Sequence, residues 1–239
     1  MRMVPIDEGE TLRLPPVMKW FGTRSERPRL MTASEADRAR RRSRSCEIIL
    51  FHSVLGLRPS VAQWADTIRA AGRTVHTPDV YGGATFDSYE EGMRHVEGMG
   101  GTPAIIARTK AAVAELPEDV VYAGFSNGAV SAELLAATRL KAPGAVLMHG
   151  AVPLLAFNVE AWPETVPIQV HYMIGDRFRE EAHLAAFAAS VRRSGAPLEL
   201  FDYPGTGHLV ADAGLADYDV TAAALMLDRV LAFLRRVSA

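Results

Sequence analysis

Short apolar runs alternate with longer amphipathic stretches along most of this chain, starting near residue 46. The apolar runs are predicted strands, because they are short, rich in β-branched side chains and bounded by turn residues. These strands are expected near 47–52, 73–77, 119–123, 144–149, 167–174 and 198–203. The amphipathic stretches are predicted helices near 60–71, 87–98, 104–116, 129–137, 179–194 and 218–236. This alternation predicts an α/β fold, a mostly parallel sheet with helices on both faces.

The last predicted helix shows the clearest periodicity. Its apolar positions recur at about the 3.6-residue spacing of a single buried stripe. The stripe is expected to comprise Val220, Ala224, Leu227, Leu231 and Leu234.

The first 45 residues differ in composition from the rest. They contain four of the 14 prolines, few periodic apolar positions, and five arginines within residues 38–44. We predict an N-terminal extension over 1–45, disordered or loosely attached, followed by one folded domain over 46–239. The arginine run could contact phosphates as a nucleic-acid or anionic-surface tether, or it could belong to a solvated leader. It has no interleaved aromatic residues, which favours the leader.

Composition narrows the class of protein. A chain of 239 residues with 49% hydrophobic content can bury one sizeable core, and a net charge of −2 gives no overall attraction to nucleic acid or acidic membranes. Neither a membrane-spanning apolar run nor a signal-peptide core is recognisable in the sequence. The one cysteine, Cys46, excludes an intramolecular disulfide framework. We expect a cytoplasmic monomer or small homo-oligomer with no nucleic-acid or membrane partner.

Residues 124–128 read Gly-Phe-Ser-Asn-Gly and match the pattern Gly-x-Ser-x-Gly. A predicted strand precedes the pattern and a predicted helix follows it, which is the context of a nucleophile elbow rather than an ordinary glycine turn. The glycines are needed because a Cβ at either position would clash with a neighbouring strand or helix. Ser126 is therefore the candidate nucleophile.

A serine hydroxyl needs a base to take its proton and a third group to hold that base. Asp176 and His208 each lie on a loop just after a later predicted strand, in the order acid then histidine that such an elbow requires. Asp176 could instead cap the following helix, and His208 could be a surface histidine. The agreement of all three residues in order and loop placement favours a catalytic triad. The remaining histidines fall mostly in predicted strands or helices: His52, His76, His95, His149, His171 and His183.

The stretches around these residues resemble the dienelactone hydrolase family of α/β-hydrolases. The resemblance runs from about residue 48 to the C-terminus, roughly four-fifths of the chain. It implies an α/β-hydrolase fold without a separate lid domain. It also implies hydrolysis of a small carboxylic ester or lactone with no metal and no cofactor. The matching segments are 50–56, 77–81, 123–129, 171–176 and 203–208.

Three departures bear on the substrate. The dienelactone-cleaving members have a cysteine at the elbow, where this chain has Ser126, and a glutamate after the first core strand, where it has Ser53. They hold the substrate carboxylate with arginines, whereas residues 81–83 and 209–212 here contain none. We therefore expect a serine variant that prefers neutral esters or lactones, with Asp212 near His208 repelling anions.

The expected mechanism is acyl transfer to water, with Ser126 as nucleophile, His208 as general base and Asp176 holding the imidazole. The oxyanion would be bound by the backbone N–H of Asn127, at the start of the elbow helix, and by that of Val54, as the resemblance also implies. The same triad could cleave a thioester or an amide. A non-catalytic protein that binds a small ligand is the remaining alternative.

The walls of a substrate pocket are harder to predict. Aromatic residues near the expected site are candidates, although each could equally belong to the core. Ser53 could shape the pocket or hydrogen-bond to Ser126. The aromatic candidates are Trp64, Tyr81, Phe86 and Trp162.

Overall fold

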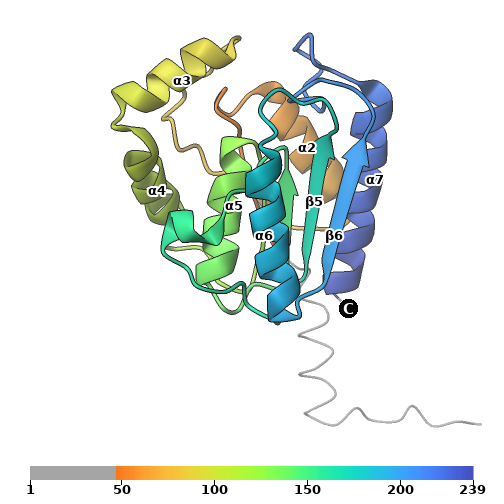
Figure 1. The fold of residues 1–239 in the computed structure, drawn as a ribbon. Coiled ribbons are helices and arrows are strands. Elements are labelled where there is room, and N and C mark those ends of the chain that lie inside the picture. Colours follow the sequence, from red (N-terminus) through yellow and green to blue (C-terminus); the bar gives the residue numbers. More distant parts are fainter. Residues whose placement is uncertain (1–46, 239) are drawn as a thin grey trace, which may run out of the picture. The chain divides into compact units, whose positions relative to one another are not determined.

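A computed structural model describes residues 47–238 and contains a six-stranded sheet whose neighbouring strands are all parallel. The strands follow the order β2-β1-β3-β4-β5-β6 across the sheet, and Figure 1 shows β5 beside β6. The predicted extension over 1–45, its arginine run and Cys46 lie outside the described residues. The strands are β1 (Ile48–Phe51), β2 (Val75–His76), β3 (Val121–Phe125), β4 (Ala145–Met148), β5 (Ile168–Met173) and β6 (Leu198–Tyr203).

Helices cover both faces of this sheet, which confirms the predicted α/β architecture (Figure 1). Helices α2 and α7 pack on one face, and α5 and α6 pack on the other. A short 3-10 helix, η1 (Leu154–Phe157), was not expected from the sequence. The α-helices are α2 (Pro59–Ala70), α3 (Tyr89–Gly98), α4 (Gly101–Ala112), α5 (Asn127–Thr138), α6 (Glu181–Ser194) and α7 (Val220–Val237).

Strand β1 shows why its sequence is continuously apolar. Successive side chains of a strand point to opposite faces, and here both faces are covered by helices. Ile48 and Leu50 join the core beneath α2 and α7, while Ile49 and Phe51 join the core beneath α5 and α6. All four side chains are almost completely buried.

Helix α7 buries a different stripe from the one predicted. Val220 is 64% exposed, and Leu227 and Leu231 are only partly buried. The buried face differs because α7 contains enough small and apolar residues to form more than one apolar face. Packing against the sheet determines which of these faces is buried. The buried residues of α7 are Ala222, Ala223, Met226, Val230, Phe233 and Leu234.

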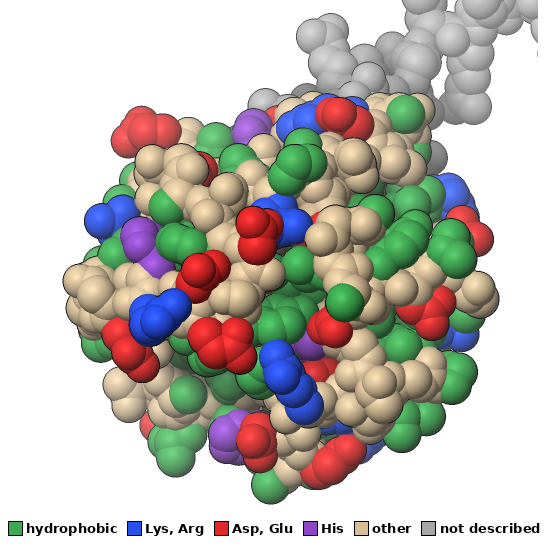
Figure 2. All heavy atoms as spheres, turned by 90° about the horizontal axis from the view of Figure 1, so that it is seen from above, with side chains coloured by type: hydrophobic (Ala, Val, Ile, Leu, Met, Phe, Trp, Pro, Cys, Tyr) green, Lys and Arg blue, Asp and Glu red, His purple; other side chains and the backbone are tan. Residues whose placement is uncertain are grey.

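Because the strands are parallel, the loops that follow them gather at one edge of the sheet, where α/β proteins commonly place their sites. Figure 2 shows this edge from above, with apolar side chains around a central hollow and both acidic and basic side chains near its rim. Ser126 follows β3, Asp176 lies beyond β5, and His208 lies beyond β6. No helix within residues 47–238 is long and apolar enough to cross a membrane.

Candidate active site

Ser126 lies between the last residue of β3 and the first residue of α5, with a φ of 54°. A positive φ is uncommon for a residue with a side chain and often marks a functional turn. A Cβ at Gly124 would overlap the carbonyl of Gly128, and a Cβ at Gly128 would overlap the carbonyl of His52. These contacts confirm the steric reason for both glycines of the elbow.

The structure brings the three predicted triad residues into one hydrogen-bonded chain. The Nε2 atom of His208 lies 2.8 Å from the Ser126 hydroxyl, and Nδ1 lies 2.7 Å from a carboxylate oxygen of Asp176. Because a carboxylate only accepts, Nδ1 carries the proton and Nε2 is free to accept from the serine O–H. Asp176 and His208 are both buried.

Asp176 does not cap the helix that follows it. Helix α6 begins at Glu181, and its N-cap residue is Glu180. The second carboxylate oxygen of Asp176 instead accepts the backbone N–H of Phe178 at 2.8 Å. This bond fixes the carboxylate so that its other oxygen faces His208.

The two predicted oxyanion donors border the same cleft as Ser126. Asn127 is the first residue of α5, where backbone N–H groups have no acceptor within the helix and the helix dipole favours negative charge. Val54 lies on the loop after β1 and lines the cleft beside Ser126. Both residues therefore occupy positions suited to their predicted role.

His52 supports the loop that carries Val54, a function that the sequence did not reveal. Its Nδ1 donates to the carbonyl of Ser53 at 2.8 Å, and its Nε2 accepts the backbone N–H of Val80 at 3.2 Å. Burial lowers the pKa of His52 despite the opposing effects of the Ser53 bond and of Asp79. A neutral imidazole thus joins the loop after β1 to the loop after β2.

A second carboxylate fixes the backbone at His208. Asp217 accepts the backbone N–H of His208 at 2.9 Å and the hydroxyl of Tyr89 at 2.7 Å. Burial acts to raise the pKa of Asp217, but the bonds from Tyr89 and from the backbone of His208 and Leu209 outweigh burial and lower it. Asp217 stays charged and holds the histidine loop against α3.

Three aromatic rings surround the imidazole of His208. Ring centroids lie 4.7 Å away for Phe178, 5.5 Å for Tyr89 and 5.7 Å for His149. The guanidinium of Arg177 lies over both Phe178 and Tyr89, 4.7 Å and 5.2 Å from their centroids. The sequence offered only one hint of this arrangement, the position of Phe178 two residues after Asp176.

Ser126 and His208 line a cleft of about 450 Å³. Helix α3 and the start of α4 form one wall, and the loop after β4 contributes His149 and Val152. Two carboxylates, Glu97 and Glu180, also line the cleft. Its apolar lining comes mainly from Val54, Met93, Val96, Val130, Ala151, Val152 and Phe178.

The predicted aromatic walls do not line this cleft. Trp162 is 1% exposed and packs against Phe187 in the core beneath α5 and α6. Phe86 packs against Tyr81, and Tyr81 belongs to a small apolar cluster with Val80 and Ile105. These apolar residues were equally suited to core packing, and the fold placed them there.

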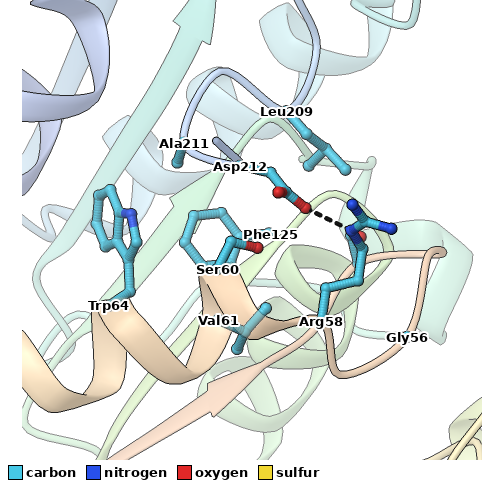
Figure 3. A pocket seen from close by; sticks show the side chains of 10 residues that line it. Gly56, Arg58, Ser60, Val61, Trp64, Phe125, Leu209, Ala211 and Asp212 are labelled. Atoms are coloured by element: carbon cyan, nitrogen blue, oxygen red, sulfur yellow. Dashed lines mark hydrogen bonds and ion pairs between the residues drawn. The ribbon is translucent and has the colours of Figure 1, made fainter. Parts of the chain in front are cut away.

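Ser53 and Trp64 border a different, much smaller cavity of about 10 Å³ (Figure 3). The Ser53 hydroxyl accepts a hydrogen bond from the backbone N–H of Leu55 at 3.1 Å, so this side chain bonds within its own loop. The expectation that Ser53 shapes the substrate pocket or bonds to Ser126 is therefore wrong.

Asp212 also faces this small cavity, where it is paired with Arg58. The Nε atom of Arg58 donates to an Asp212 carboxylate oxygen at 2.7 Å. The dashed line in Figure 3 marks this interaction. Asp212 is buried and its charge is compensated, so the expectation that it repels anionic substrates near His208 is wrong.

Within residues 47–238, no group of three or more histidine, cysteine, aspartate or glutamate side chains is arranged to hold a metal ion.

Solved structures with the same fold include several hydrolases. The dienelactone hydrolase-like promiscuous phosphotriesterase P91, from metagenomic libraries, matches with a TM-score of 0.70 at 19% identity, over 80% of this chain and 86% of that chain. Esterase PE8 matches with a TM-score of 0.55 at 17% identity, over 81% of this chain and 93% of that one. A phospholipase/carboxylesterase from Dyadobacter fermentans matches with a TM-score of 0.56 at 14% identity, over 80% and 92%. These likenesses show the α/β-hydrolase fold.

No curated protein matches this chain significantly. The family model of the dienelactone hydrolase family matches residues 35–238, which include the whole sheet and Ser126, Asp176 and His208. The chain belongs to the dienelactone hydrolase family.

Proposed function

We propose that this chain is a serine hydrolase that cleaves a carboxylic ester or lactone of a small molecule through an acyl-enzyme on Ser126. One observation carries the proposal: Asp176, His208 and Ser126 form a continuous hydrogen-bonded chain at a strained elbow that opens into a cleft. A buried carboxylate, an imidazole and a hydroxyl in this order are the parts that activate a serine for acyl transfer.

In the first half of the reaction, His208 removes the proton of Ser126 as the hydroxyl oxygen attacks the substrate carbonyl. Asp176 keeps the imidazole in the correct tautomer and stabilises its charged form. The tetrahedral oxyanion accepts hydrogen bonds from the backbone N–H groups of Asn127 and Val54. Loss of one such donor typically costs about 3 kcal/mol of transition-state stabilisation. His208 then gives its proton to the leaving alcohol, and an acyl-enzyme remains.

In the second half, water attacks the acyl-enzyme while His208 again accepts a proton. The same two N–H groups bind the second oxyanion, and the acid product leaves as the serine recovers its proton.

The cleft supports a small, uncharged substrate. Its volume of about 450 Å³ falls in the range of small-molecule sites, and much of its lining is apolar. Glu97 and Glu180 would disfavour an anionic substrate. The two carboxylates outnumber the guanidinium of Arg177, which lies over two rings that line the cleft, Tyr89 and Phe178. A neutral preference is thus expected from these two carboxylates rather than from Asp212. A thioester or amide would use the same triad and remains the alternative class.

The test is turnover of a panel of short- and long-chain esters, lactones, thioesters and amides by the wild type, Ser126→Ala and Ser53→Ala. We expect neutral short esters or lactones to be the best substrates. Ser126→Ala should reduce kcat by about 10⁴- to 10⁶-fold, as in other triad enzymes, and Ser53→Ala should retain most of the activity. Appreciable turnover by Ser126→Ala would refute the assignment of the nucleophile. A folded wild type without turnover would favour a ligand-binding protein.

A further inference from the structure

His149 lies directly beside the elbow, at the first position after β4. Its backbone N–H donates to the carbonyl of His171 at 2.8 Å, and its φ is 61°. A Cβ on the next residue, Gly150, would meet the carbonyl oxygen of Ser126. The chain at His149 therefore passes against the turn that holds the nucleophile, in a conformation that few side-chain-bearing residues adopt.

His149 lines the cleft, and its buried side chain is left without hydrogen bonds. It is 2% exposed, and neither ring nitrogen has a partner among the described residues. Burial, together with His208 and His171, lowers its pKa well below the ordinary value. The ring is therefore neutral, with one N–H to donate and one nitrogen to accept.

Two other buried histidines show what an ordinary structural role looks like here. In His171, Nδ1 bonds to the Tyr203 hydroxyl at 2.8 Å and Nε2 to the Gln169 side chain at 2.9 Å. In His52, both ring nitrogens are also hydrogen-bonded. A buried polar group without partners destabilises a fold, so its presence beside the nucleophile indicates a role in function.

We propose that His149 is a substrate-binding residue, whose neutral imidazole hydrogen-bonds to an uncharged oxygen substituent that the substrate carries near its scissile carbonyl. The inference rests on ester hydrolysis at Ser126 and names a substrate class, the esters or lactones of hydroxy or keto acids. The neighbouring cleft residues Val130 and Val152 have no side-chain group that could make this bond. A binding role also accounts for the tolerated strain at this position.

The experiment compares kcat/KM for p-nitrophenyl butyrate with that for its 2-hydroxy and 3-hydroxy derivatives. The wild type should prefer at least one hydroxy ester by about tenfold or more, since a site built around a hydrogen bond discriminates against a ligand that lacks it. His149→Phe should bring that ratio close to one, whatever its effect on butyrate turnover itself, because the ratio compares the two substrates on the same variant. His183→Phe is the matched control, because His183 also lines the cleft but is exposed, and it should keep the ratio.

His149→Asn is the second variant, since asparagine suits a positive φ but is too short to reach the same substituent. Thermal unfolding of both variants checks that they are folded, so that a changed ratio reports on substrate binding and not on loss of the fold. A wild type without preference, or a ratio unchanged in both variants, would overturn the inference. Failure of the proposed function gives a different result. In that case the wild type would not cleave p-nitrophenyl butyrate, or Ser126→Ala would cleave it as well.

Discussion

The buried pair of Arg58 and Asp212 connects the start of α2 to the loop that follows His208. The side chains are 11% and 10% exposed, and the guanidinium also bonds to the Phe86 carbonyl at 2.8 Å and to Asp87 at 2.7 Å. Burial acts to lower the pKa of Arg58, but the bonds to Asp87 and Asp212 outweigh burial and raise it. Arg58 thus stays charged, and these acceptors offset the cost of burying its charge in the folded protein.

Asp212→Asn keeps the side-chain size but removes the charge opposite Arg58. Removing one partner of a buried pair typically costs about 3–5 kcal/mol. Arg58 retains Asp87, whose side chain is 96% exposed, and the Phe86 carbonyl. We therefore expect the free energy of unfolding to fall by about 2 kcal/mol, below that range because the remaining acceptors compensate part of the lost charge.

Urea unfolding at neutral pH measures this loss, and Asp66→Asn is the matched control. Asp66 pairs with Arg69 at the same 2.7 Å, but the two side chains are 72% and 41% exposed, so its loss should cost less than about 1 kcal/mol. A loss for Asp212→Asn no larger than that of Asp66→Asn would refute the argument. Ester hydrolysis should change little, because Asp217 holds the backbone of His208 independently.

Three further predictions follow from buried groups, from the extension and from the cleft. Burial, aided by Arg229, lowers the pKa of His171 to about 3, so the unfolded chain binds the proton first as pH falls below 6.5. Between pH 6.5 and 5 this histidine should cost about 2 kcal/mol of stability, and His171→Gln should flatten the pH dependence of urea unfolding. Removal of residues 1–45 should leave hydrolysis of small esters largely intact, whereas a large loss in a folded core would show that they contribute to the cleft. Neutral esters should have a higher kcat/KM than matched anionic ones, by a margin that salt reduces if Glu97 and Glu180 cause it.

The strands could be predicted because each carries a short apolar signal of its own. The strand before the elbow was expected at 119–123 but runs over Val121–Phe125. The discrepancy has a local cause: Gly124 and Phe125 belong to the Gly-x-Ser-x-Gly turn in sequence, yet both pair with β4 in the sheet. Ser126, Asp176 and His208 could also be predicted from the sequence, because each lies in a turn or loop with distinctive neighbouring residues.

The cleft could not be predicted, because its walls depend on contacts between distant segments. Tyr89 reaches His208 from a helix 119 residues earlier in the chain, and Arg58 neutralises Asp212 across 154 residues. Neither contact produces a recognisable pattern in the local sequence around the residues that make it. Trp162 shows the opposite error, since a large aromatic side chain fits a core and a pocket equally well until its neighbours are known.

Covalent labelling with a fluorophosphonate probe tests most directly whether Ser126 is an activated nucleophile. Peptide mass spectrometry of the wild type should place one adduct on Ser126, because only a serine with a base and an oxyanion site reacts readily with such a probe. The adduct should be absent from Ser126→Ala and form far more slowly in His208→Ala. A folded wild type that is not labelled, or that is labelled on another residue such as Ser53, would contradict the account.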